Sequence, residues 1–213
     1  MIRIKVAVGI AALICSTVSM AESQREAVEH LQKQWAIDNY QLTDKAKKEG
    51  FETLIEQADQ KISAFPNSAE LYIWRGIIKS TYAGAKGGLG ALKYAKSAKA
   101  DLEKALELDA DALQGSAYTS LGTLYFNVPG WPIGFGDDDK AEALLKKALL
   151  INPDGIDPNY FYGDYLRSEK RYAEAKAYME KALLAKPRKG RLLADEGRRK
   201  EIRKALSGIE KHL

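Results

Sequence analysis

The sequence contains one cysteine, Cys15, and two histidines, His30 and His212. A single cysteine cannot form an internal disulfide, and the two histidines stand near opposite ends of the chain, so no histidine-rich metal pattern exists. Strand signals are almost absent, and nothing in the sequence places two carboxylates in one pocket. We therefore expect a protein that is not an enzyme and that has neither a cofactor nor a metal site.

The sequence also lacks an apolar run long enough to cross a bilayer. The longest run, Val6–Val18, has 13 residues, whereas about 20 are needed. Arg3 and Lys5 precede this run, and small residues occupy positions −3 and −1 before a cleavage point after Ala21. The pattern predicts that residues 1–21 are a secretory signal peptide and that the protein is exported to the periplasm.

Removal of that segment changes both the cysteine content and the charge. Cys15 is lost with it, and Ile14 precedes this cysteine where a lipid-attachment signal has a small residue. The remaining chain has no thiol chemistry and depends on packing for its stability. Its 31 lysines and arginines nearly balance 29 acidic residues, but residues 186–213 hold ten basic and four acidic residues. The positive charge is thus concentrated at the C-terminal end.

A spacing pattern recurs along the rest of the chain. In its clearest copy Gly163, Tyr172, Ala175, Ala182 and Pro187 follow one another at gaps of nine, three, seven and five residues. The gaps of seven and five recur twice upstream, after Gly76 and after Gly122, and more weakly before residue 66. This spacing resembles the helix–turn–helix unit of the tetratricopeptide repeat (TPR). Small residues at these places allow two antiparallel helices to approach closely.

The resemblance implies an all-α fold, a TPR-like α-solenoid of about four helix–turn–helix repeats in a single domain over residues 22–213. The expected repeats are 35–66, 69–112, 115–155 and 156–189, with a C-terminal capping helix over 191–211. The aspartates at 137–139 and Asp157 before Pro158 are expected to cap helix N-termini. We expect the basic capping helix to be solvated, with contact to acidic lipid as the alternative, so membrane contact is at most peripheral.

Two insertions interrupt the regular spacing, each at the turn inside a repeat. One is glycine-rich, over 83–90, and the other is the Val128–Gly136 loop, which contains Trp131, Ile133 and Phe135. Exposure of these apolar side chains is unfavourable, so the loop is expected to fold back on the repeats, as a structural plug or as a lid over a ligand. Because such turns emerge on one side of a solenoid, the two insertions are expected to form one rim.

The segments 121–125, 128–137 and 152–162 give a closer match. They resemble a group of small exported bacterial TPR proteins, itself similar to the periplasmic TPR component associated with TRAP transporters. That resemblance implies a binding role. In TPR proteins the first helices of the repeats line a concave groove, which here implies a wall that includes Ile73, Ile77 and Ser80 in the second repeat. With the aromatic loop added, the predicted binding residues are Thr119, Thr123, Phe126, Trp131, Phe135, Tyr160, Asp164 and Arg167.

Two functions are compatible with this groove. The first is a scaffold that binds a peptide or protein partner, and the alternative is a small-solute-binding accessory component of an envelope transporter. The scaffold predicts an open groove, whereas the solute binder predicts an enclosed cavity ringed by Trp131, Phe135 and residues near Arg167. Arg167 can bind a carboxylate or pair with Asp164 on its own helix. Nucleic acid is not expected as a partner, and the sequence does not determine the oligomeric state.

Overall fold

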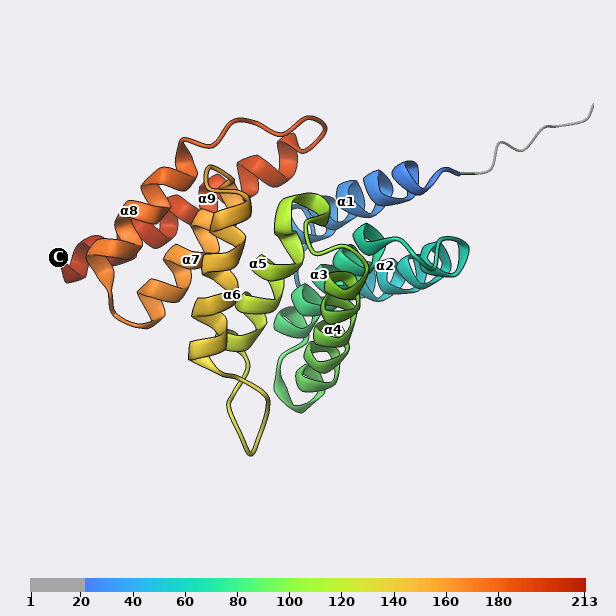
Figure 1. The fold of residues 1–213 in the computed structure, drawn as a ribbon, viewed down its shortest axis with the longest axis horizontal. Helices are drawn as coiled ribbons and strands as arrows, with labels where there is room; N and C mark the ends of the chain where they lie inside the picture. Colours follow the sequence, from blue (N-terminus) through green and yellow to red (C-terminus); the bar gives the residue numbers. More distant parts are fainter. Residues whose placement is uncertain (1–21) are drawn as a thin grey trace, which may run out of the picture.

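A computed structural model of the chain describes residues 22–213, and the predicted signal peptide with its cleavage point lies outside them (Figure 1). The described residues form nine α-helices and a final 3-10 turn, with no strand among them. The helices are α1 Gln24–Tyr40, α2 Asp44–Ala64, α3 Ala69–Lys86, α4 Gly88–Leu108, α5 Ala112–Asn127, α6 Asp138–Ile151, α7 Ile156–Ser168, α8 Tyr172–Leu183 and α9 Leu192–Ile209. Helices α1 to α8 pack as consecutive pairs, and each pair packs on the next. The fold is the predicted all-α TPR-like solenoid.

The small residues of the repeat stand where helices meet. A Cβ added to Gly163 of α7 would lie 2.9 Å from Cγ of Met179 and 3.2 Å from the carbonyl oxygen of Ala175, both in α8. Gly76 and Gly122 make the same approach to α4 and α6, respectively. The three positions confirm the physical reason for the repeat spacing, because a side chain at any of them would separate the two helices of a pair.

Helix starts are only partly as expected. Ser23 and Glu26 form a reciprocal capping box on α1, and the Asp137 carboxylate accepts a hydrogen bond from the backbone N–H of Lys140 at the start of α6. The prediction for Asp157 was wrong. Helix α7 begins at Ile156, two residues before the predicted start at Pro158, and no side chain caps it. Asp157 instead forms ion pairs with arginines from the C-terminal part of the chain.

The glycine-rich insertion lengthens two helices and forms no rim. Helices α3 and α4 run to 18 and 21 residues and are joined by Gly87 alone. The backbones of Gly87 and Gly88 have φ of 65° and 62°, in the left-handed region that glycine adopts at little cost, so these two residues reverse the chain.

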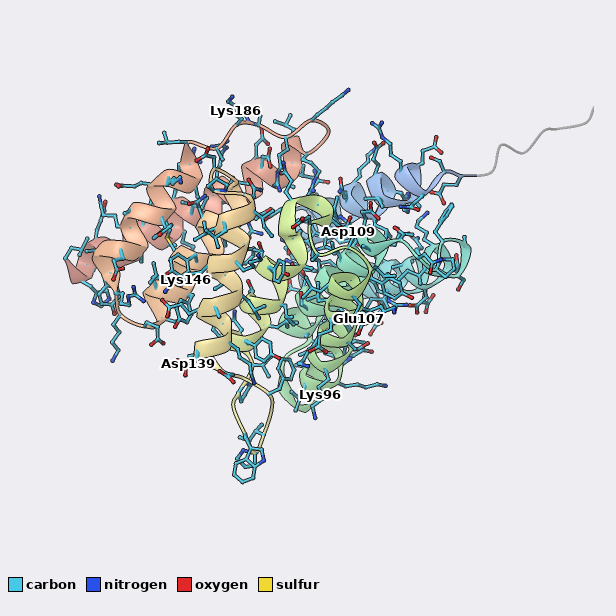
Figure 2. The ribbon with its side chains drawn as sticks, in the orientation of Figure 1. Lys96, Glu107, Asp109, Asp139, Lys146 and Lys186 are labelled. Carbon is cyan, nitrogen blue, oxygen red and sulfur yellow. The ribbon has the colours of Figure 1, made fainter. Side chains whose placement is uncertain are left out.

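The Val128–Gly136 loop folds back in part. Phe135 packs edge-on against Tyr125 with ring centroids 5.6 Å apart, and the backbone N–H of Asp137 bonds to the carbonyl of Tyr125. Trp131 is 90% exposed and Ile133 is 68% exposed, contrary to expectation. The loop projects from the base of α5 and α6, away from the concave side of the solenoid (Figure 1, Figure 2). Its C-terminal half is thus anchored, while its tip stands in solvent.

Helix α9 closes the solenoid. Ile202 and Ile209 are fully buried against the last repeat, while Ala194 joins the core cluster of the N-terminal helices. Helix α9 therefore contacts both α7 and α8 and, at the other end of the array, α1. Among the described residues no helix is long and apolar enough to cross a membrane.

Candidate functional site

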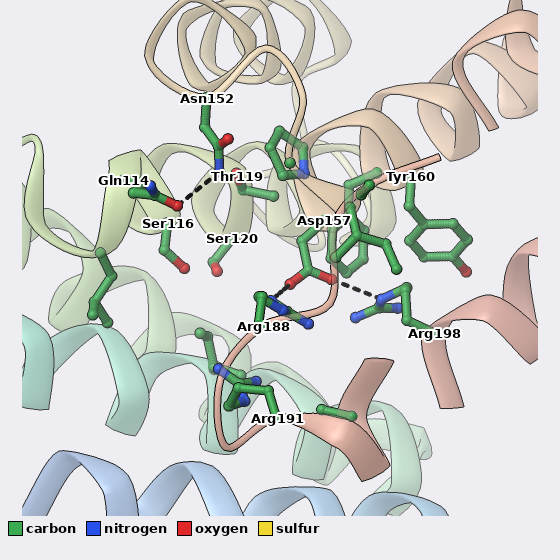
Figure 3. Close-up of a pocket in the computed structure, with 18 of the residues that line it drawn as sticks. Gln114, Ser116, Thr119, Ser120, Asn152, Asp157, Tyr160, Arg188, Arg191 and Arg198 are labelled. Carbon is green, nitrogen blue, oxygen red and sulfur yellow. Dashed lines mark hydrogen bonds and ion pairs between the residues drawn. The ribbon is translucent and has the colours of Figure 1, made fainter. Parts of the chain in front are cut away.

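A cavity of about 1060 Å³ occupies the concave side of the solenoid (Figure 3). The first helices of the four pairs contribute to its wall, and the segment from Leu184 to Arg198 passes across it. Because α9 reaches α1, the concave side is partly covered by an element that is distant in sequence. Its wall contains the following residues from α3, α5 and α7: Trp74, Ile77, Ser80, Thr81, Leu113, Gln114, Ser116, Thr119, Ser120, Thr123, Tyr160 and Phe161.

Asp157 organises the ion pairs on one side of the cavity. Its Oδ2 atom lies 2.6 Å from Nη1 of Arg188, and its Oδ1 atom lies 2.8 Å from Nε of Arg198 (Figure 3). Burial opposes ionisation of this carboxyl, but the charges of Arg198 and Arg188 outweigh burial and hold its pKa well below the ordinary value. Arg188 also bonds to the buried Asp195 at 2.7 Å, and Arg198 bonds to Glu201. Both arginines thus have their charge balanced inside the protein.

Arg191 differs from these two arginines. Its guanidinium carbon lies 4.8 Å from the ring centre of Trp74, and its side chain makes no ion pair or hydrogen bond with any described residue. Burial, followed by the nearby charge of Arg188, lowers the pKa of Arg191 to about 10. Arg191 therefore still carries its positive charge at neutral pH, on the cavity wall and without a carboxylate partner.

The opposite wall contains strained backbone. Leu113 and Gln114 have φ of 48° and 57°, in the left-handed region that side chains disfavour, and Gly115 follows with φ 72°. This turn directs Gln114 toward Asn152. The side-chain amide of Asn152 donates a hydrogen bond to Oε1 of Gln114 at 3.3 Å. Ser116 and Ser120 on the next turn add hydroxyl groups to the same wall (Figure 3). The wall is thus polar and capable of both donating and accepting hydrogen bonds.

The structure separates the predicted binding residues into two groups. Thr119, Thr123 and Tyr160 line the cavity, as do Ile77 and Ser80 from the predicted groove, whereas Ile73 is in the core. The other five predicted residues stand outside the wall of the cavity: Phe126, Trp131, Phe135, Asp164 and Arg167.

Each residue of the second group has a different environment. Phe126 packs against Tyr165, and Arg167 pairs with Asp164 at 2.7 Å, which is the helix-surface pairing considered from sequence. The cavity is accordingly not ringed by the aromatic loop or by residues near Arg167.

Sequence reasoning missed the charged side of the site. It assigned Asp157 to helix capping and treated Arg198 as part of a solvated helix, although the Arg198 side chain is 10% exposed. Its guanidinium carbon lies 4.5 Å from the ring centres of both Tyr160 and Phe161. Only the concentration of arginine near the C-terminus was a signal, and it did not identify the partners. The described part of the chain gathers no group of three His, Cys, Asp or Glu side chains suited to a metal ion.

Comparisons with known proteins agree with this architecture. Residues 156–189 match the tetratricopeptide repeat family model. A thermophilic TPR protein of Thermus thermophilus has a similar structure, with a TM-score of 0.57 and 17% identity over 88% of this chain and 98% of that chain. MamA has a TM-score of 0.46 and 22% identity over 79% of this chain and 91% of that chain. A comparison with curated proteins gave no match. The repeat match and the Thermus structure support a TPR-like fold, which is typical of protein-interaction scaffolds.

Proposed function

We propose that this protein is a non-catalytic periplasmic scaffold that binds a peptide or protein segment in its concave cavity. The observation that carries the proposal is a single cavity wall that combines exposed hydroxyl and amide groups with aromatic and cationic side chains. Such a surface can bind backbone amides, apolar side chains and an acidic group of one extended segment. The periplasmic location rests on the predicted signal peptide, residues 1–21.

The cavity is held in shape by interactions within the protein. Asp157 holds Arg188 and Arg198 in place by ion pairs. Trp35 of α1 donates a hydrogen bond to the hydroxyl of Thr81 of α3 at 3.0 Å. A preformed site loses less conformational entropy on binding than a flexible one, which favours affinity for a segment that becomes ordered on the protein. The Val128–Gly136 loop, with Trp131 in solvent, adds a second contact surface for a larger partner.

One observation favours the alternative, a small-solute-binding accessory component of an envelope transporter. Helix α9 closes the concave side against α1, and the cavity volume of about 1060 Å³ is close to the range of small-molecule sites, roughly 300–1000 Å³. The open groove that a scaffold predicts is thus partly covered. A solute binder would use the same wall but would not require the exposed loop.

Site-directed photo-crosslinking from the cavity tests the proposal. A photoreactive benzoylphenylalanine at Ser116, and in parallel at the exposed Lys146 of α6 as control, would be introduced into the protein produced in its own cells. We expect a protein-derived segment to be crosslinked from position 116 and not from position 146. The cavity-filling substitution Ser120→Trp should abolish this crosslink, because the added indole occupies the space of the bound segment.

Three outcomes decide between the functions. Loss of the position-116 crosslink in Ser120→Trp supports a segment bound in the cavity. Equal crosslinking with and without Ser120→Trp places the partner elsewhere and contradicts the proposal. A small molecule found by native mass spectrometry in wild type but not in Ser120→Trp, with no crosslinked protein, favours the solute-binding alternative.

A further inference from the structure

Three buried polar atoms without a hydrogen-bond partner among the described residues belong to residues that line the cavity. They are the hydroxyl oxygen of Tyr40, Nε1 of Trp74 and Nε of Arg191. All three belong to groups that donate hydrogen bonds. The two other unpartnered buried atoms, Oδ2 of Asp38 and Oδ1 of Asn159, are acceptors and belong to residues outside the wall. Because buried polar groups are normally bonded, this side of the cavity has a surplus of donors.

Two of these three donors, those of Arg191 and Trp74, belong to side chains that lie against each other. Figure 3 shows Arg188 and Arg198 on either side of Asp157, while Arg191 stands apart from that carboxylate. Trp74 is 4% exposed, and the guanidinium of Arg191 lies over its ring. Stacking explains the position of the guanidinium, but it provides no acceptor for the N–H groups of either side chain. Arg191 is therefore a fixed cation of the cavity without an anionic partner among the described residues.

We propose that Arg191, supported by Trp74, is the anchoring residue for a carboxylate group of the ligand. This inference rests on the proposed function, since it names the chemical group that binds in the same cavity. A planar carboxylate can accept two parallel N–H bonds from a guanidinium. A singly charged group is favoured over a phosphate dianion because it balances the single charge of Arg191, while Arg188 and Arg198 are already paired with Asp157.

The surroundings of Arg191 indicate what the carboxylate is attached to. Trp74 lies against Arg191, and Ile77, one helical turn along α3, lines the same cavity, so the atoms next to the carboxylate meet an apolar surface. A peptide C-terminus preceded by an apolar residue has this chemistry, and so does a small organic acid with a hydrocarbon body. Both sources share the apolar carboxylate, and the experiment separates them.

The test uses the purified protein and follows the side-chain N–H signals of arginine by NMR. The Arg191 signal is assigned by its loss in Arg191→Lys. Four probes are titrated: an acetylated hexapeptide mixture with free C-terminal carboxylates, the same mixture as C-terminal amides, phenylacetate and inorganic phosphate. We expect the free-acid peptides or phenylacetate to shift the Arg191 signal, and the amides and phosphate to leave it unchanged. A response to peptide alone identifies a chain terminus, whereas a response to phenylacetate alone identifies a small acid.

A matched pair of variants measures the contribution of the cation. Arg191→Gln should weaken binding of the responding probe by roughly 10-fold or more, as for loss of a charge-assisted hydrogen bond. Arg203→Gln, which removes an exposed arginine of α9, the helix that follows Arg191, should not change it. Arg191→Lys retains the charge without the planar fork and should give an intermediate affinity.

Failure of this inference is distinct from failure of the proposed function. If Ser120→Trp abolishes binding and Arg191→Gln does not, the cavity is the site and the role of Arg191 is wrong. Tighter binding of phosphate than of either carboxylate probe overturns the choice of anion. If no probe shifts the Arg191 signal, the inference fails, and the photo-crosslink from position 116 still decides the proposed function.

Discussion

Gly197 of α9 lies directly against the ring of Tyr40 of α1, and this contact joins the last helix of the solenoid to the first. A Cβ at position 197 would overlap the ring, which packs in turn on Trp35 with ring centroids 5.7 Å apart. The absence of a side chain at one position thus allows α9 to cross the concave side. The shape of the cavity depends on that crossing.

Substitution of Gly197 with alanine is expected to lower the free energy of unfolding by about 1–3 kcal/mol, because the added methyl group forces α9 and α1 apart. Gly208, on the same helix, has open space around it. Gly208→Ala should stabilise the protein by up to about 1 kcal/mol, since alanine favours helix. Urea denaturation followed by circular dichroism measures both, and equal stability of the two variants would show that the closure does not matter.

Replacement of Asp157 with asparagine should destabilise the fold by about 2 kcal/mol at neutral pH, because Arg188 and Arg198 lose their shared partner. The carboxylate is 27% exposed, so the loss should be smaller than for a fully buried pair. The control is Asp154→Asn, since Asp154 is 88% exposed and its pair with Lys181 should contribute little. Chemical denaturation at neutral pH gives the two differences, and a similar small loss for both would contradict the structural role of Asp157.

The contribution of Asp157 should also depend on pH. Burial opposes its ionisation, but Arg198 and Arg188 lower its pKa in the folded protein far below the unfolded value of about 3.9. The stabilisation is therefore fully present above about pH 5 and is lost as the pH falls further, because the unfolded chain takes up a proton that the folded chain does not. The stability gap between wild type and Asp157→Asn should narrow from pH 5 to pH 2.5. A gap that is constant over this range would rule out the depressed pKa.

The two aromatic residues of the Val128–Gly136 loop should behave differently. Trp131→Ala is expected to change the free energy of unfolding by less than about 0.5 kcal/mol, because its side chain is already in solvent. Phe135→Ala should cost about 2 kcal/mol, because Phe135 packs on the core beside Tyr125. Thermal unfolding measures both changes. Acrylamide quenching of tryptophan fluorescence, compared between wild type and Trp131→Ala, checks the exposure of Trp131. Strong protection of Trp131 from quenching would mean that the loop tip is covered.

The repeat pattern predicted the fold because each element of it is local. Gly163 and Ala175 are 12 residues apart, and their spacing alone requires two helices to turn and pack closely. Thr119 and Thr123, which follow from that geometry, line the cavity, and their role in binding stays a prediction.

The charged side of the site could not be predicted in this way. Asp157 pairs with arginines 31 and 41 residues away, and Arg191 stacks on Trp74 from the opposite end of the chain. Those contacts depend on how far the solenoid curves and on where α9 crosses it. No residue spacing in the sequence indicates the curvature of the solenoid or the place where α9 crosses it.

The contact between α9 and α1 also affects when the cavity forms during synthesis. Helices α1 and α9 are the first and last of the described helices to be made, so a chain still being translated has the repeats but not the complete wall. Arg188, Arg191 and Arg198 all arrive with the final segment. A protein cut short before residue 188 would retain helices α1 to α8 yet lack the arginine side of the wall beside Trp74, so the cavity is complete only once the final segment has been made.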